Sequence, residues 1–181
     1  MSNVVYKSVY SSIKRSLVHT STFSENGLAM RAGLTTLDVL EDEQLGKRAT
    51  IAGEKLRKSL LERLSKYEMF SEVRGIGLLN AVQFKPPKTL KLRLGFEALS
   101  KIHPALFGQV LVMHLFREHR ILSQVCGNDF MVLKVSPPLT IEDAQLERFV
   151  SALEHTVAAV HHSSGFWSEP IKIGQRLFRS M

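Results

Sequence analysis

The chain has 181 residues, of which 44% are hydrophobic and 23% are charged, and its formal net charge is +7. This balance is typical of a globular protein that buries a sizeable core, and it excludes a disordered or fibrous chain. The longest apolar run, residues 105–116, contains Gln109 and His114 and is too short and too polar to span a bilayer.

The first third of the chain shows two helical patterns. Small and apolar residues recur at helical spacing over residues 28–40, and Asn26 or Ser24 is placed to cap the start of that helix. Residues 45–64 predict a longer amphipathic helix, because apolar side chains follow one face and charged side chains the other.

The middle of the chain changes between strand and helix patterns. Residues 73–84 predict a strand, within which residues 74–77 form a flexible entry. Residues 106–116 predict a second long helix that ends near Arg120, and residues 121–125 predict a short strand after it.

The last third predicts a strand, a capped helix and a tail. A turn at residues 127–128 precedes a strand at residues 130–135, and residues 140–143 resemble a capping box before a helix that runs to Val160. Residues 163–181 differ in composition and are expected to dock on a neighbouring surface. Together the elements predict an α/β fold with helices packed on a short sheet.

Positive charge is concentrated in two stretches. These are Lys7, Lys14 and Arg15 before any acidic residue, and Lys85, Lys88, Lys91 and Arg93 in a connection that contains two prolines. Aromatic side chains do not alternate with them as they would on a base-stacking surface, so solvated basic loops are favoured over a nucleic-acid interface. The single Cys126 and the absence of a secretory pattern near residue 1 make the cytoplasm the expected compartment.

Common catalytic and metal-binding signatures are absent. Gly75 and Gly77 lack the third glycine of a dinucleotide loop, and no phosphate-binding lysine loop or serine elbow occurs. His114 and His119 are five residues apart and do not share a helix face, and the histidines do not combine with Cys126 in a metal-binding spacing. No metal site is predicted.

Residues 19–26, His-Thr-Ser-Thr-Phe-Ser-Glu-Asn, form a hydroxyl-rich segment before a predicted helix start. Hydroxyls donate hydrogen bonds to phosphate oxygens, and the free amides at a helix start attract an anion. The same residue types are typical of plain helix capping, which the spacing alone favours.

Three motifs in chain order resemble the class III pyridoxal phosphate (PLP) aminotransferases, a family that includes ornithine, acetylornithine and 4-aminobutyrate aminotransferases. Residues 19–29 are similar to the family's His-x-x-Thr-[Phe/Tyr]-x-x-Asn-Pro-Leu segment. Residues 73–79, Val-Arg-Gly-Ile-Gly-Leu-Leu, and residues 137–140, Pro-Pro-Leu-Thr, are similar to two later family motifs. The order and separation of the motifs extend the resemblance over about residues 1–160.

The resemblance implies the carboxy-terminal portion of a fold-type I transferase in which PLP acts as an electron sink. Residues 1–23 would end the large PLP-binding domain, residues 24–162 would form the small domain, and residues 163–181 would be a basic extension. An amino group would pass from an amine or amino acid to a keto acid or aldehyde. The complete enzyme would be a homodimer.

The resemblance also implies site residues. Thr22 matches the family threonine that contacts the cofactor phosphate across the dimer interface, and Ser21 is a weaker neighbour. Arg74 matches a family arginine whose role is equally that of ordering the strand, so it is not assigned to catalysis.

Two positions depart from the family pattern. Lys134, the expected substrate-binding residue, stands where the family usually has arginine, and an ammonium cannot form the two parallel hydrogen bonds of a guanidinium. An amine or ω-amino donor is therefore favoured over an α-carboxylate donor. Gly27 stands where proline is usual, which weakens the preset geometry of the turn.

The resemblance places the lysine that binds the cofactor covalently further upstream of Thr22 than this chain extends. No catalytic residue is therefore expected, and the chain alone is expected to be inactive, as a truncated gene product, an engineered fragment or one piece of a split enzyme. The alternative is a non-enzymatic basic α/β module that binds protein or nucleic acid.

Overall fold

The computed structural model describes residues 2–15, 22, 26–127, 129–162 and 166–167. The chain divides into two compact units, Met1–Glu43 and Gln44–Met181. None of the helices in the described ranges combines the length and the apolar character that a membrane crossing requires.

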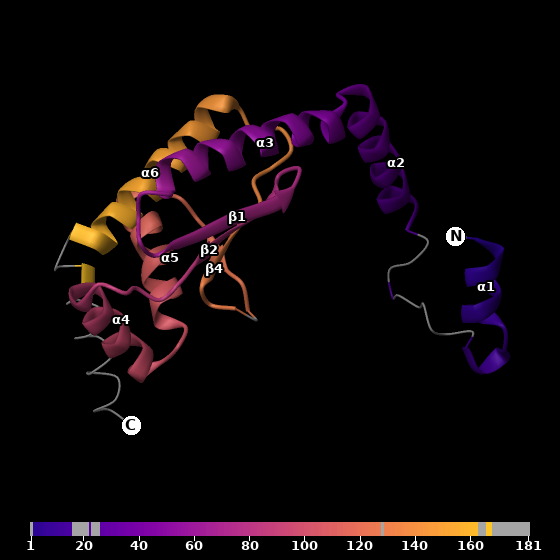
Figure 1. Cartoon of the computed structure of the whole chain (residues 1–181). Helices are drawn as coiled ribbons and strands as arrows, with labels where there is room; N and C mark the ends of the chain where they lie inside the picture. Colours follow the sequence, from indigo (N-terminus) through magenta and orange to yellow (C-terminus); the bar gives the residue numbers. More distant parts are fainter. Residues whose placement is uncertain (1, 16–21, 23–25, 128, 163–165, 168–181) are drawn as a thin grey trace. The chain divides into compact units, whose positions relative to one another are not determined.

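The first unit is helical. It contains α1 (Asn3–Tyr10), a short 3-10 turn (Ile13–Arg15) and α2 (Gly27–Asp42), drawn in indigo and purple in Figure 1. The side-chain oxygen of Asn26 accepts a hydrogen bond from the backbone N–H of Ala29 at 3.1 Å, which confirms the predicted helix and its cap at Asn26. The other predicted cap, Ser24, lies outside the described residues.

Neither α1 nor α2 has a buried residue. Several large apolar side chains of α2 are exposed, namely Leu28, Met30, Leu34, Leu37 and Val39. An exposed apolar surface of this kind is typical of a helix that packs against another protein segment.

The second unit is built on a four-stranded antiparallel sheet with the strand order β1-β2-β4-β3. The strands are β1 (Phe70–Ile76), β2 (Leu79–Phe84), β3 (Gln124–Val125) and β4 (Val132–Val135). Every second residue of β2 is buried, which is the pattern of a sheet with one face against a core. The register sets Val82 opposite Leu133, and both belong to the buried face.

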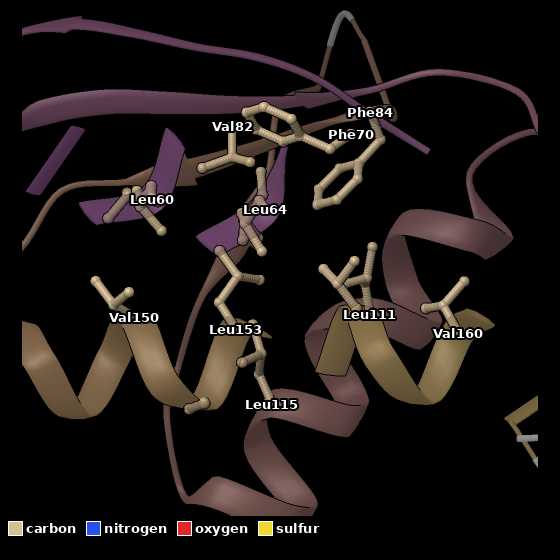
Figure 2. Packing of buried hydrophobic residues seen from close by; sticks show 14 of the residues in the cluster. Leu60, Leu64, Phe70, Val82, Phe84, Leu111, Leu115, Val150, Leu153 and Val160 are labelled. Atoms are coloured by element: carbon tan, nitrogen blue, oxygen red, sulfur yellow. The ribbon is translucent and has the colours of Figure 1, made fainter. Parts of the chain in front are cut away.

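Helices from both ends of this unit pack together with the sheet. They are α3 (Leu45–Leu64), α4 (Leu90–Ile102), α5 (Leu106–His119) and α6 (Asp143–His162). The α3 helix contacts β1, β2 and α6, while α5 lies between α6 and α4 (Figure 1). Figure 2 shows their apolar side chains meeting in one core: Leu60 and Leu64, Phe70, Val82 and Phe84, Leu111 and Leu115, Val150, Leu153 and Val160. The predicted α/β fold with helices on a short sheet is confirmed.

The α3 helix passes very close to the turn between β1 and β2. A Cβ atom added to Gly53 would lie 1.8 Å from the carbonyl oxygen of Gly77, and one added to Gly75 would lie 2.3 Å from the backbone of β2. Gly77 has a φ of 50°, a conformation that glycine adopts without strain. Arg57 Nη1 donates to the Gly77 carbonyl at 3.1 Å and to Asn80 Oδ1 at 2.8 Å. The Val-Arg-Gly-Ile-Gly motif therefore forms part of a hairpin that is fastened to α3.

The prediction of a single strand over residues 73–84 is wrong. These residues form most of a β-hairpin, because Gly77 and Leu78 reverse the chain between β1 and β2. Residues 74–77 are not a flexible lead into a strand, since Arg74 to Ile76 pair with Leu79 to Ala81 in the ladder. The strand predicted at residues 121–125 is shorter and consists of Gln124–Val125.

The α4 helix is not predicted by the sequence pattern. Lys91 and Arg93, which are expected in a loop, lie in this helix. The Glu68 carboxylate accepts hydrogen bonds from the hydroxyl and backbone N–H of Thr89 and from the backbone N–H of Lys88, and these bonds lower the Glu68 pKa. Because Glu68 lies 21 residues before Thr89, no local cap marks this helix start.

The capping box expected at residues 140–143 is not the cap that the structure shows, which is a single side-chain bond two residues later. The backbone N–H of Glu142 donates to Gln145 Oε1 at 3.0 Å, and α6 begins at Asp143. Arg48 Nη2 holds the preceding segment by donating to the carbonyls of Thr140 at 3.0 Å and Ile141 at 2.9 Å. The helix itself is confirmed.

Two residues of the predicted extension belong to the core. Phe166 and Trp167 are 8% and 9% exposed. The Trp167 indole stacks on Phe107 with ring centroids 6.2 Å apart, and Trp167 Nε1 donates to the carbonyl of Val160 at 2.8 Å. The core therefore continues beyond α6.

Candidate functional site

A row of mostly polar side chains crosses the sheet on the face opposite the core. In the register of the sheet, Arg74 pairs with Ala81, Ala81 with Lys134, and Lys134 with Gln124. Residues paired directly in antiparallel strands project from the same face. Arg74, Gln124 and Lys134 are exposed, so this polar row is accessible in the second unit.

Arg74 is held within the sheet by its neighbours on the same face. Its Nη1 donates to the carboxylate of Glu72 on its own strand and to the side-chain oxygen of Gln83 on β2. These bonds link β1 to β2, which supports a role for Arg74 in ordering the hairpin.

Lys134 lies at the edge of a pocket of about 400 Å³. The pocket is formed by residues 120–123 before β3, residues 134–138 at the end of β4, and the first turns of α6. Arg120 and Arg148 contribute two further positive charges, and no acidic side chain of the described residues lines the pocket. The Ser123 hydroxyl, also in the lining, is buried and has no hydrogen-bond partner among the described residues.

The chemistry of this pocket favours an anion with an apolar part. Three cations attract a carboxylate or phosphate, and the Ser123 hydroxyl can donate a hydrogen bond to it. Ile121, Leu146 and Phe149 add an apolar wall. The ammonium of Lys134 forms no ion pair with any described residue, so its charge is available to such a group.

The predicted cofactor contacts lie in the first unit, whereas Lys134 lies in the second. Thr22 is exposed in a turn, so its hydroxyl is available to a phosphate oxygen. Ser21 lies outside the described residues, as does most of the hydroxyl-rich segment at residues 19–26. In the part of the chain that the structure describes, no group of three or more His, Cys, Asp or Glu side chains is arranged to hold a metal ion.

The sequence predicts Lys134 as a site residue but does not indicate the other two cations that line the same pocket. Arg120 follows the last residue of α5, and Arg148 lies in the second turn of α6. Neither residue stands in a recognisable motif with Lys134, because Arg148 comes next to the end of α5 only through the packing of α6 against α5. Arg120 has a left-handed backbone conformation, with φ of 57°, and this conformation cannot be read from the sequence.

The sequence model of the family described as aminotransferase class-III matches residues 2–157. A diaminobutyrate--2-oxoglutarate aminotransferase from Rhizobium meliloti is 36% identical over 135 residues, which cover 75% of this chain and 28% of that protein. The 5-aminovalerate aminotransferase DavT from Pseudomonas aeruginosa is 31% identical over 134 residues, with 73% of this chain and 28% of the relative covered.

Solved structures agree with the sequence comparisons. An ornithine aminotransferase from Toxoplasma gondii superposes with a TM-score of 0.62 at 30% identity, covering 79% of this chain and 29% of that one. The chain thus spans less than a third of the length of these relatives. Since the match covers most of the chain and includes all three motifs, the chain belongs to the class III aminotransferase family.

Proposed function

We propose that this chain forms the small domain of a PLP-dependent class III aminotransferase, which transfers an amino group from an amine or amino acid to a keto acid or aldehyde. The observation that carries the proposal is the family match over residues 2–157 together with a sheet that has a cationic pocket at one edge. Family membership favours this enzyme over a non-enzymatic basic module.

The proposed domain boundaries follow the order of the motifs along the chain. Residues 1–23 end the cofactor-binding domain, residues 24–162 form the small domain, and residues 163–181 extend it. The exposed apolar side chains of α2 and the polar row of the sheet are surfaces for the rest of a longer enzyme to cover. A cytoplasmic homodimer is the proposed state of that enzyme.

Bound PLP supplies the electron sink that makes amino transfer possible. The Thr22 hydroxyl, with Ser21 beside it in sequence, would hold the cofactor phosphate by donating a hydrogen bond to it. Lys134 attracts the carboxylate of the substrate, and Arg120 and Arg148 add positive charge to the same pocket. These residues bind and orient the cofactor or the substrate, and none of them is assigned a proton-transfer step.

Lys134 suits a substrate whose carboxylate must be attracted to the pocket but does not have to be held in one orientation. An ammonium is a point charge on a flexible stem, whereas a guanidinium holds a carboxylate in one plane. Amino donors whose amino group lies far from the carboxylate, and amines without a carboxylate, depend least on such planar hydrogen bonding. The relative named for 5-aminovalerate has a substrate of this type, which supports an amine or ω-amino donor for this protein.

Replacing Lys134 with arginine should shift donor preference. In a chimaera that joins the upstream part of the Rhizobium relative to this chain, K134R should raise kcat/KM for α-amino acids over simple amines by about tenfold, because a bidentate hydrogen bond is gained. The same substitution at Lys101, exposed on α4, is the matched control and should leave the ratio unchanged. An unchanged ratio in K134R would remove Lys134 from the substrate site.

The same chimaera tests the proposed function. It should bind PLP covalently, seen by visible absorption of the bound cofactor, and transfer amino groups, whereas this chain alone should neither bind PLP covalently nor transfer amino groups at high PLP concentration. After borohydride reduction of the chain with PLP, mass spectrometry should find no single lysine labelled stoichiometrically. A folded, PLP-bound chimaera without amino transfer would contradict the proposal, and so would turnover by the chain alone.

A further inference from the structure

Three histidines gather where the end of α5 packs on α6. The rings of His114 and His119 on α5 lie 6.1 Å apart, and His119 stacks on His155 of α6 at 5.9 Å. His114 Nδ1 lies 3.1 Å from Oγ1 of Thr156, which is fully buried. Arg148 Nη2 donates to the backbone carbonyl of His119 at 3.1 Å. This histidine seam, defined by His114, His119 and His155, thus joins the last turns of α5 to α6.

The surroundings of the seam disfavour protonation of the two α5 imidazoles. Burial lowers the pKa of both His114 and His119. His119 further lowers the pKa of His114, while His155 and Arg148 lower that of His119; Glu118 opposes them by raising both. The helix α4 and strand β3 also contact α5, but no charged side chain among their described residues affects either imidazole.

The direction of the resulting pH dependence follows from linkage. A base whose pKa is lowered by folding binds its proton more weakly in the folded than in the unfolded chain. The folded state is therefore favoured above the ordinary imidazole pKa of about 6.5, and this advantage is lost as the pH falls below that value. Protonation also places new positive charge beside Arg148, at the contact that holds the end of α5.

We propose that the histidine seam is an acid-sensitive contact that releases the last turn of α5 from α6 as the pH falls from about 7 to about 5. That turn ends at His119 and is followed by Arg120, which lines the cationic pocket together with Ile121. Release of the turn therefore changes the pocket beside Lys134. The seam lies within the second unit, so the inference stands independently of the proposed function.

Thermal unfolding of the whole chain at pH 7.5 and pH 5.5 tests the proposal, with fluorescence of Trp167, the only tryptophan, as the signal. The Tm of the unmodified chain should fall on acidification, and in the double variant H119Q/H155Q this fall should be about 2–4 °C smaller. Glu118→Gln removes a carboxylate that favours protonation of His114 and His119, so its Tm should fall by more than that of the unmodified chain. His162→Gln, an exposed histidine on the same α6 helix, should match the unmodified chain.

Two direct measurements on the unmodified chain locate the effect. An NMR titration should place the His119 midpoint below 6.5. Hydrogen exchange, corrected for intrinsic pH dependence, should show amides of residues 115–119 losing protection at pH 5.5 while those of α3 keep it. Any one of four results would overturn the proposal. These are a His119 titration midpoint at or above 6.5, a smaller fall of Tm in E118Q than in the unmodified chain, equal falls of Tm in all variants, or equal loss of amide protection in α3 and α5.

Discussion

Replacing Gly53 with alanine should lower the free energy of unfolding of the second unit by about 3 kcal/mol or more. The added Cβ would lie 1.8 Å from the oxygen and 2.4 Å from the carbon of the Gly77 carbonyl. That carbonyl is held in place because it accepts hydrogen bonds from Arg57 and from Asn80 Nδ2, both at 3.1 Å. Relief of the clash requires α3 to move away from the hairpin, which withdraws Leu56 from the core. Urea unfolding followed by circular dichroism measures the loss.

A matched control lies on the same helix. Nothing lies within 4 Å of a Cβ added to Gly46, so Gly46→Ala should be neutral or should stabilise the unit by up to about 1 kcal/mol through helix propensity. The contrast between the two substitutions isolates the close approach of α3 to the hairpin. If G53A were as stable as G46A, the close packing described here would be incorrect.

Replacing Trp167 with alanine should lower the free energy of unfolding by about 3–5 kcal/mol. The indole is 9% exposed and stacks on Phe107, and a Cβ added to Gly95 would lie only 2.8 Å from its ring. It therefore fills the space between α4 and α5, and its Nε1 satisfies the carbonyl of Val160. Without it, α4 loses part of its packing and should lose hydrogen-exchange protection before α3 does.

Two variants show whether this effect comes from the buried ring. Trp167→Phe keeps most of the apolar volume but removes the donor to Val160, so its loss should be intermediate. Phe116→Ala removes an aromatic ring that is 45% exposed and should cost much less than W167A. Similar losses in W167A and F116A would mean that residues 166–167 add no more stability than a surface contact.

The sequence by itself determined the family and the principal helices. The order of the motifs at residues 19–29, 73–79 and 137–140 indicates the class III aminotransferases, and the family match over residues 2–157 confirms it. The helices at Leu45–Leu64 and Asp143–His162 are predicted because their apolar residues repeat at the helical period. Lys134 is predicted to bind substrate because it stands three residues before Pro137, and this stays a prediction. Each motif and each helix pattern is visible within a short stretch of the chain.

The tertiary structure alone decided the features whose partners are far apart in the chain. Glu68 caps α4 from 21 residues upstream, and Gly53 must be glycine because the backbone of Gly77 lies against it. The pocket draws Arg120, Lys134 and Arg148 from three different segments, and the histidine seam likewise joins two helices. Local propensity and residue spacing do not predict such contacts, because the contacts arise only when apolar helix and strand faces pack and bring distant residues together.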